Sequence, residues 1–258
     1  MKSISSKSSF IDAHCHLDLY DEKEIQIPNL VENALKSGVE IIVANGVNPA
    51  SNKRVIVLAD IYPNVYPSLG LYPIDALKLT DEEIGSEISF IEENKEKILA
   101  IGEVGMDFKE DTSNIKRQME IFSKIISLSL RINKPLIIHS RKAEKEVIQL
   151  LERFKARKVI MHCFSGKFSL VKKIIDNNWI LTIPTSVKSS EHFQKVIQEA
   201  PIENLLCETD SPYLHPDKKW PNEPALVVES YKKIAQIKNL PLDVVKERIF
   251  QNYLRVIS

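Results

Sequence analysis

Six residues of metal-binding types follow short apolar segments of this chain, and together they could activate water. His14 and His16 follow the first such segment, and the others are Glu103, His139, His162 and Asp210. Imidazole and carboxylate groups bind divalent cations, which lower the pKa of water. In an α/β barrel, side chains at the C-terminal ends of the strands converge on one mouth. The pattern therefore predicts a metal-dependent site, provided that these segments are strands of one barrel.

The first segment ends in Asp12-Ala13-His14-Cys15-His16. Alternate residues of a strand point to the same side, so both imidazoles can face the barrel axis and share one ion, while Cys15 points away from them. A single histidine is more often an ordinary core or surface residue. Two histidines at this spacing after a buried strand favour metal binding.

Two carboxylates complete the candidate set. Glu103 ends an apolar run, where a buried carboxylate is costly unless it is paired or bound to a metal. Its neighbours Gly102 and Gly105 suggest a close approach of backbone, although a salt bridge between strands would also explain the glutamate. Asp210 could bind a metal and accept a proton from water. The alternative is a turn or helix-capping aspartate before Pro212.

Further charged residues lie just beyond these segments. His139 and His162 could each bind a second metal. Arg141 and Lys167 follow them and could contact a phosphate, or they could be solvated charges at helix starts. Glu208 is either a structural carboxylate or a partner that orients a histidine.

The elements that must position these residues alternate along the chain. Eight short, mostly continuous apolar runs are typical of strands buried on both faces of a parallel sheet. They span residues 10–14, 40–45, 65–71, 98–104, 136–139, 158–163, 179–182 and 205–209. Helix patterns occur between and after them, over 28–38, from Thr80, over 115–133, 223–238 and 242–256. The longest pattern puts Met119, Phe122, Ile125, Ile126 and Leu130 on one face. The even number of predicted strands, and the distribution of the candidate ligands over the ends of five of them, favour an α/β fold of the (β/α)8 TIM-barrel type over an open sheet.

Length and composition agree with one soluble domain. The 258 residues match the usual size of a single barrel. We expect a flexible N-terminal extension over residues 1–8 and a TIM-barrel hydrolase domain over 9–258. Lys and Arg balance Asp and Glu at 35 each, which excludes a polycationic binder of the histone type. No membrane-spanning run or signal core is present, and the three cysteines lack a CxxC spacing, so we expect a cytoplasmic protein.

The motifs as a set resemble the TatD family of metal-dependent deoxyribonucleases, a branch of the amidohydrolase-like barrels. They run in family order from about residue 10 to the end of the chain. The matching stretches are Ile11-Asp12-Ala13-His14-Cys15-His16-Leu17, Gly102-Glu103-Val104-Gly105-Met106-Asp107-Phe108, Gln118-x-x-x-Phe122, Lys134-Pro135-Leu136-Ile137-Ile138-His139-Ser140-Arg141, His162-Cys163-Phe164-Ser165-Gly166, Glu208-Thr209-Asp210-Ser211-Pro212-Tyr213-Leu214 and Asn222-Glu223-Pro224-Ala225.

The resemblance implies a site for two divalent metal ions, Mg²⁺, Mn²⁺ or Zn²⁺. His14, His16 and Asp210 would hold one ion, His139 and His162 the other, and Glu103 would bridge them. Asp210 and Glu103 would be the catalytic carboxylates. The chain departs from the family pattern at Tyr72, which stands where the family usually has a histidine, so a phenol would supply or alter a substrate contact.

These observations predict an enzyme that hydrolyses ester bonds. We expect a monomeric deoxyribonuclease that cleaves DNA phosphodiester bonds as a 3′-to-5′ exonuclease, on single strands or 3′ ends. Arg141, Lys167 and Tyr72 are the candidate substrate contacts, and Lys188, Lys218 and Lys219 could add positive charge at the mouth. The alternative is an amidohydrolase or deacylase that uses the same metal site on a small carbonyl substrate. A binding protein without turnover is disfavoured by the retention of two costly carboxylates, Glu103 and Asp210.

Overall fold

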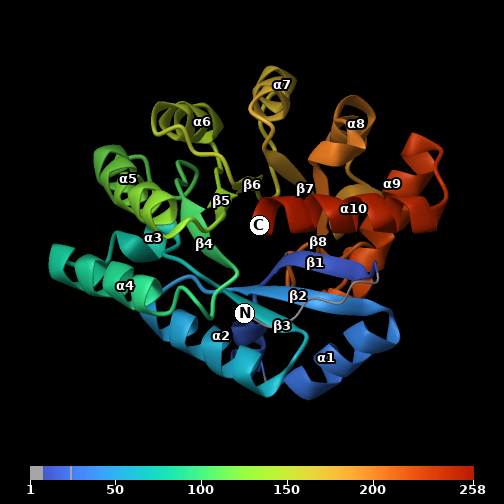
Figure 1. Cartoon of the computed structure of the whole chain (residues 1–258), viewed down its shortest axis with the longest axis horizontal. Helices are drawn as coiled ribbons and strands as arrows, with labels where there is room; N and C mark the ends of the chain where they lie inside the picture. The colour runs from blue at the N-terminus through green and yellow to red at the C-terminus, as the bar shows by residue number, and fades with distance from the viewer. Residues whose placement is uncertain (1–7, 24) are drawn as a thin grey trace.

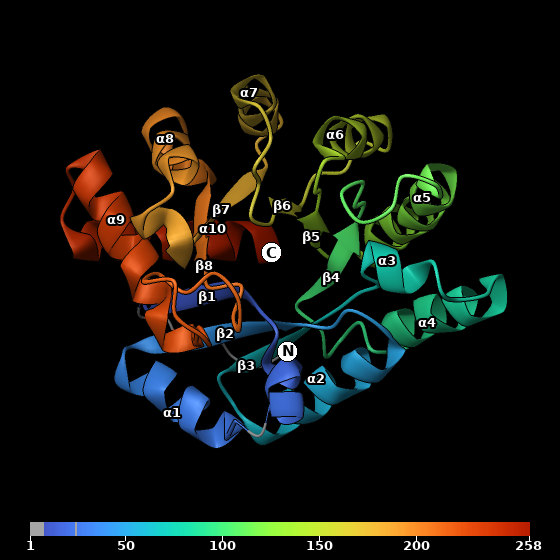
Figure 2. The ribbon, with the colours of Figure 1, turned by 180° about the vertical axis from the view of Figure 1, so that it is seen from behind.

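The computed structural model describes residues 8–23 and 25–258 of the chain. Eight parallel strands form one sheet in sequential order, and the helices lie around the outside of the strands (Figures 1 and 2). This arrangement confirms the predicted (β/α)8 barrel. The predicted extension over residues 1–8 lies outside the described residues apart from Ser8, so the domain bounds stay a prediction.

The strands are short and nearly fully buried. They are β1 (Phe10–Cys15), β2 (Val39–Asn45), β3 (Val65–Leu69), β4 (Ala100–Gly105), β5 (Leu136–His139), β6 (Val159–Met161), β7 (Ile180–Pro184) and β8 (Leu205–Glu208). Each of the eight predicted runs overlaps a strand, with bounds that differ by a few residues. The sixth ends earlier than predicted because Cys163 has a φ of +41°, which leaves the extended region and turns the chain.

Helices alternate with these strands in the described part of the chain. The α-helices are α1 (Ile27–Lys36), α2 (Pro49–Ile61), α3 (Pro73–Ala76), α4 (Asp81–Glu93), α5 (Ile115–Ile132), α6 (Glu144–Arg153), α7 (Phe168–Asp176), α8 (Glu191–Glu199), α9 (Val228–Lys238) and α10 (Leu242–Ile257). Short 3-10 segments are η1 (Leu17–Lys23), η2 (Thr185–Lys188), η3 (Ile202–Asn204) and η4 (Pro224–Val227). None of these helices is both long and apolar enough to cross a membrane.

Local sequence signals explain several helix ends. The side chain of Thr80 accepts from the backbone of Glu83 and the side chain of Glu83 accepts from the backbone of Thr80, which forms a capping box at the start of α4, where a helix was predicted from Thr80. Gly38, just after α1, has a φ of +80°, as a helix-stopping glycine should.

The predicted buried face of α5 was wrong at one residue. Leu130 is 45% exposed, whereas Leu128 and Ser129 are buried. The buried stripe follows steps of three and four residues from Gln118 through Ile125 to Leu128, and Leu130 lies past its edge.

The barrel closes between β8 and β1 by contacts at one end of the two strands. The backbone N–H of Asp210 donates to the carbonyl of His14 at 2.9 Å, and that of His16 donates to Ser211 at 2.8 Å. Figure 1 shows β1 beside β8 at this seam. As a result, His14 in β1 and His16 just after it lie next to the aspartate that follows β8.

Candidate metal centre

Five of the six predicted metal ligands line one cavity of about 440 Å³: His16, Glu103, His139, His162 and Asp210. The sixth, His14, is completely buried beneath them. Each comes from the C-terminal end of a strand or from the residues just after it, on β1, β4, β5, β6 and β8. The fold therefore brings together residues up to 196 positions apart in the chain, at the end of the barrel where active sites form.

His14, His16 and Asp210 form one compact group of donor atoms. The Nε2 atoms of the two histidines are 3.2 Å apart, and each lies 3.6 Å from Oδ1 of Asp210. The ligand atoms of the three residues lie within 4.8 Å of one another, as a shared cation requires. The backbone carbonyl of Asn45 lies 3.1 Å from Nδ1 of His16 and fixes the orientation of that ring.

A second group consists of His14, Glu103 and His162, again with ligand atoms within 4.8 Å. The rings of His14 and His162 stack with their centroids 3.7 Å apart. Glu208 orients His162, because its Oε2 lies 2.9 Å from Nδ1 of that ring while its Oε1 accepts from the backbone of Cys163 at 3.1 Å. Of the two alternatives for Glu208, the contact supports the partner that orients a histidine.

His139 contacts a carboxylate on each side of its ring. Its Nδ1 lies 2.8 Å from Oε1 of Glu103, and its Nε2 lies 2.9 Å from Oδ2 of Asp107. The hydroxyl of Tyr72 donates to the same Asp107 oxygen at 2.9 Å. Among the described residues, His139 belongs to neither compact group of donor atoms, although it touches the glutamate that would bridge them.

Burial and charge perturb the titration of the whole cluster. Burial raises the pKa of Asp210 to about 6 and lowers that of His14 well below its usual range. For His16, the effect of burial is outweighed by Glu103, and the pKa rises to about 9. For His162, the charge of Glu208 outweighs burial and raises the pKa to about 10. Without a bound cation, protons on these two rings would balance the carboxylates of the cluster.

The donor set suits a divalent cation. Buried imidazole nitrogens face carboxylate oxygens at 3.3–3.6 Å, and two ring nitrogens lie as close as 3.2 Å. Without a metal, these buried nitrogen and oxygen lone pairs can be compensated only by protons between them. A divalent cation would accept electron pairs from all of these atoms at once. Nitrogen and oxygen donors in this mixture are compatible with Zn²⁺, Mn²⁺ or Mg²⁺.

Backbone approaches around Glu103 explain its glycine neighbours. Gly105 has a φ of +142°, and a Cβ atom built there would lie 1.9 Å from the carbonyl oxygen of His139. A Cβ atom on Gly102 would lie 2.6 Å from Cβ of Ile137. The predicted close approach is confirmed at both positions. Asp210 itself has a φ of +54°, a conformation that aspartate tolerates better than most residues.

The predicted substrate contacts lie at different places. Tyr72 and Arg141 line the cavity of the metal centre, where Arg141 also pairs with Glu110 at 3.0 Å. Lys167 lines a separate groove of about 530 Å³ between α6 and α7, which shares no lining residue with the cavity of the metal centre. Lys188 pairs with Asp217 at 2.6 Å.

Sequence reasoning missed two residues that organise the site. Asp107 lies within a quoted motif but received no role, and its contact with His139 joins residues 32 positions apart. Asn222 is fully buried and donates to the carbonyl of Thr209 at 2.9 Å and to Oγ1 of Thr185 at 3.0 Å. The only signal in the sequence was the presence of a polar residue in each motif. The sequence did not indicate which residues Asp107 and Asn222 would contact.

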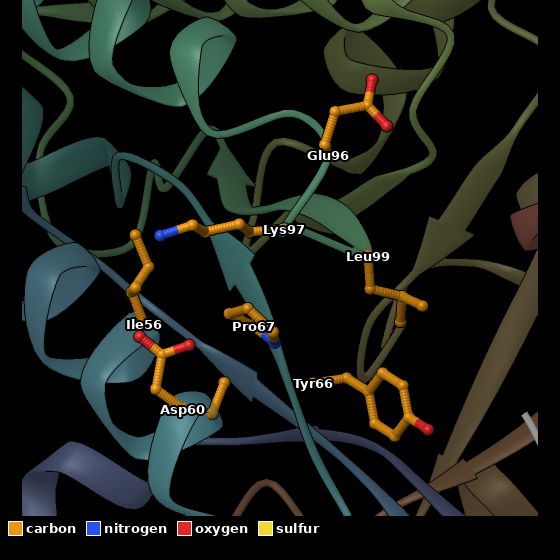
Figure 3. A pocket seen from close by; sticks show the side chains of 8 residues that line it. Ile56, Asp60, Tyr66, Pro67, Glu96, Lys97 and Leu99 are labelled. Carbon is orange, nitrogen blue, oxygen red and sulfur yellow. The ribbon is translucent and has the colours of Figure 1, made fainter. Parts of the chain in front are cut away.

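Another cavity, of about 180 Å³, lies near the opposite ends of the strands (Figure 3). Ile56 and Asp60 of α2 line it together with Tyr66, near the start of β3, and Leu99, just before β4. Its described lining contains none of the predicted site residues. Features at this end of a TIM barrel usually contribute to stability rather than to catalysis.

Comparisons with known proteins agree with the motifs. The family model described as TatD related DNase matches residues 11–258. An uncharacterized metal-dependent hydrolase of Methanocaldococcus jannaschii is 36% identical over 94% of this chain and 94% of its own length. The human deoxyribonuclease TATDN3 is 32% identical over 95% of this chain and 93% of its own. The crystal structure of YjjV, a TatD homologue from Escherichia coli K12, superposes with a TM-score of 0.85 at 25% identity, covering 94% of this chain and 95% of that one.

Proposed function

The chain belongs to the TatD family of metal-dependent hydrolases, which act on ester bonds, and we propose that it is a deoxyribonuclease. The proposed reaction is hydrolysis of DNA phosphodiester bonds from a strand end, in the 3′-to-5′ direction. The observation that carries the proposal is the gathering of three imidazoles and two carboxylates around one open cavity, with the fourth imidazole, His14, buried beneath them.

We propose two divalent cations as cofactors, with Mg²⁺, Mn²⁺ and Zn²⁺ as candidates. His14, His16 and Asp210 would hold one, His139 and His162 the other, and Glu103 would bridge. Bound cations of this kind lower the pKa of water and offset the negative charge that develops on a phosphate. The compact group of His14, His16 and Asp210 supports the first site, and the Glu103 contacts with both His14 and His139 support a bridging role.

The protein's own side chains would perform the remaining steps. Oδ1 of Asp210, at the cavity wall, would accept the proton of the attacking water. The guanidinium of Arg141 would bind a phosphate oxygen after leaving Glu110, since a planar guanidinium suits phosphate geometry. Asp107 and Glu208 would hold the rings of His139 and His162 in position.

We further propose that the enzyme acts as a monomer in the cytoplasm. Its cysteines Cys15, Cys163 and Cys207 are all free, which supports a reducing compartment. A molar mass in solution corresponding to more than one 29.4 kDa chain would contradict the monomer.

The test is release of nucleotides from end-labelled single-stranded DNA. Metal-stripped protein should be inactive, and addition of Mg²⁺, Mn²⁺ or Zn²⁺ should restore a ladder that shortens from the 3′ end. The Asp210→Asn variant, purified in parallel, should give no ladder and so exclude a contaminating nuclease. Absence of DNA cleavage with every metal, together with hydrolysis of amides or aminoacyl esters, would favour the carbonyl-directed alternative. The amidohydrolase of this fold from Saccharomyces cerevisiae is 16% identical, a likeness that concerns the fold alone.

A further inference from the structure

We propose that Tyr213 and Trp220 form a stacking platform for the bases of single-stranded DNA beside the metal centre. This inference rests on the proposed function and assigns a substrate contact that lies outside the metal ligands. The side chains of Tyr213 and Trp220 are exposed by 47% and 55%, and their ring centroids lie 5.7 Å apart. Exposed neighbouring aromatic rings are a feature of surfaces that bind unpaired bases.

The platform adjoins the proposed reaction site. Tyr213 lines the cavity of about 440 Å³ and a neighbouring cavity of about 420 Å³, and both also include His162 and Asp210. Its backbone N–H donates to the carbonyl of Asp210 at 2.9 Å. A nucleotide whose phosphate lies at Asp210 therefore has its base within reach of Tyr213, and the next base can meet Trp220.

The geometry of the two rings favours a single strand. Their planes are inclined by 52° to each other. Stacked bases of a duplex are parallel and about 3.4 Å apart, so a duplex cannot present one base to each ring. An unpaired strand can rotate each base independently to match the two planes. The platform thus selects unstacked nucleotides rather than paired ones.

The loop that carries the rings is fixed in advance of binding. The buried Asn222 donates through its backbone N–H to the carbonyl of Pro212 at 2.9 Å, and through its side chain to Thr209 and Thr185. Residues 212 and 222 enclose the loop, so both aromatic residues lie on a closed segment tied to the end of β8. Preorganised contacts of this kind reduce the entropy lost on binding.

Positive charge accompanies the rings. Lys218 and Lys219 directly precede Trp220, and both are exposed. The nearby Asp217 is paired with Lys188, which offsets its negative charge. Lysines next to aromatic side chains are the combination that attracts the backbone of a single strand while its bases stack.

The chain offers a direct probe, because it contains two tryptophans and the other, Trp179, is 1% exposed. The experiment uses the full chain carrying Asp210→Asn, so that DNA is bound and not cleaved. An oligothymidylate and an abasic oligonucleotide of the same length are titrated while tryptophan fluorescence and the anisotropy of a labelled strand are recorded. We expect the thymidylate to quench Trp220 and to bind more tightly than the abasic strand.

Substitutions at Trp220 then separate stacking from charge. Trp220→Ala should weaken thymidylate binding by about ten-fold and leave abasic binding unchanged, and Trp220→Tyr should retain most of the affinity. Thermal unfolding of Trp220→Ala at the same Tm as its parent would exclude a folding defect.

Each outcome separates this inference from the proposed function. Suppose that the wild-type protein binds and cleaves DNA. Equal affinities of the Asp210→Asn parent and its Trp220→Ala variant for thymidylate would then overturn the stacking platform alone. Equal losses for thymidylate and the abasic strand would also overturn it, because the contact would then not involve bases. A wild-type protein that neither binds nor cleaves DNA would overturn the proposed function and the platform with it.

Discussion

The carboxylate of Asp12 in β1 accepts two hydrogen bonds from Thr209 at the end of β8. The backbone N–H of Thr209 donates to Oδ1 at 2.8 Å, and its hydroxyl donates to Oδ2 at 2.6 Å. Asp12 and Thr209 are both fully buried and lie 197 positions apart. This pair bridges the seam where the barrel closes. Asp12 lies two residues before His14, and Thr209 lies directly before Asp210.

Replacement of Asp12 should therefore weaken the fold and misalign the site. Asp12→Ala leaves two buried donors of Thr209 without an acceptor, so we expect a loss of about 2–4 kcal/mol in the free energy of unfolding. Urea unfolding measures this loss. Asp176→Ala, on the surface of α7, is the matched control and should change the free energy little. A free energy for Asp12→Ala equal to that of the control would contradict the role of the pair.

Asp210→Asn should abolish most turnover while leaving the fold intact. The change removes the proton acceptor and one charged donor, so we expect kcat to fall by about 10²–10⁴-fold. Steady-state kinetics on single-stranded DNA and thermal unfolding measure the two properties. Asp243→Asn, an exposed carboxylate on α10, should keep wild-type kinetics. Activity near wild type in Asp210→Asn would refute the assigned role.

Tyr72→Phe tests the hydroxyl that shares an Asp107 oxygen with His139. Without it, Asp107 holds the histidine ring less firmly, and we expect kcat/KM to fall by about 10-fold or more. Metal content after dialysis should fall in parallel if the effect acts through His139. Unchanged kcat/KM and metal content would make the phenol purely structural.

Acid should remove the stabilising contribution of Asp111, which begins the loop before α5. Hydrogen bonds from Asn114 and Ser113 lower its pKa from 3.8 to about 2. Because the folded pKa is the lower one, the contribution is complete above about pH 4 and is lost as the pH falls toward 2. Asp111→Ala should lower the Tm near pH 7, and the difference from wild type should narrow near pH 3. Asp111→Asn also removes the titrating group, so its difference from wild type should narrow by the same amount. A difference that stays constant between pH 7 and pH 3 for both variants would contradict the assignment.

Removal of metal should lower thermal stability. A ligand that binds the folded state alone, at about 100 times its Kd, stabilises it by about 2.7 kcal/mol. For a chain of this size this corresponds to a Tm shift of about 5–10 °C. Calorimetry of chelator-treated protein, before and after addition of Mn²⁺ or Zn²⁺, measures the shift. Glu103→Ala should reduce it, and an identical Tm with and without every metal would argue against a resident cation.

The sequence by itself determined the strands, part of the helices and the types of the candidate ligands. Continuous apolar runs marked all eight strands, since strands covered on both faces need no polar side. The two-residue spacing of His14 and His16 placed both rings on one side of β1, because this relationship is local to one strand.

Tertiary structure decided which side chains meet. The pairing of Asp12 with Thr209, the contact of Glu208 with His162, and the two carboxylates on His139 join residues far apart in the chain. The proximity of Tyr213 to Trp220 likewise depends on how one loop folds back. Periodicity is set by neighbouring residues and can be read along the chain, whereas these contacts depend on the register between strands and on the loop conformations. Both are fixed only when the barrel closes and every buried polar group has to find a partner.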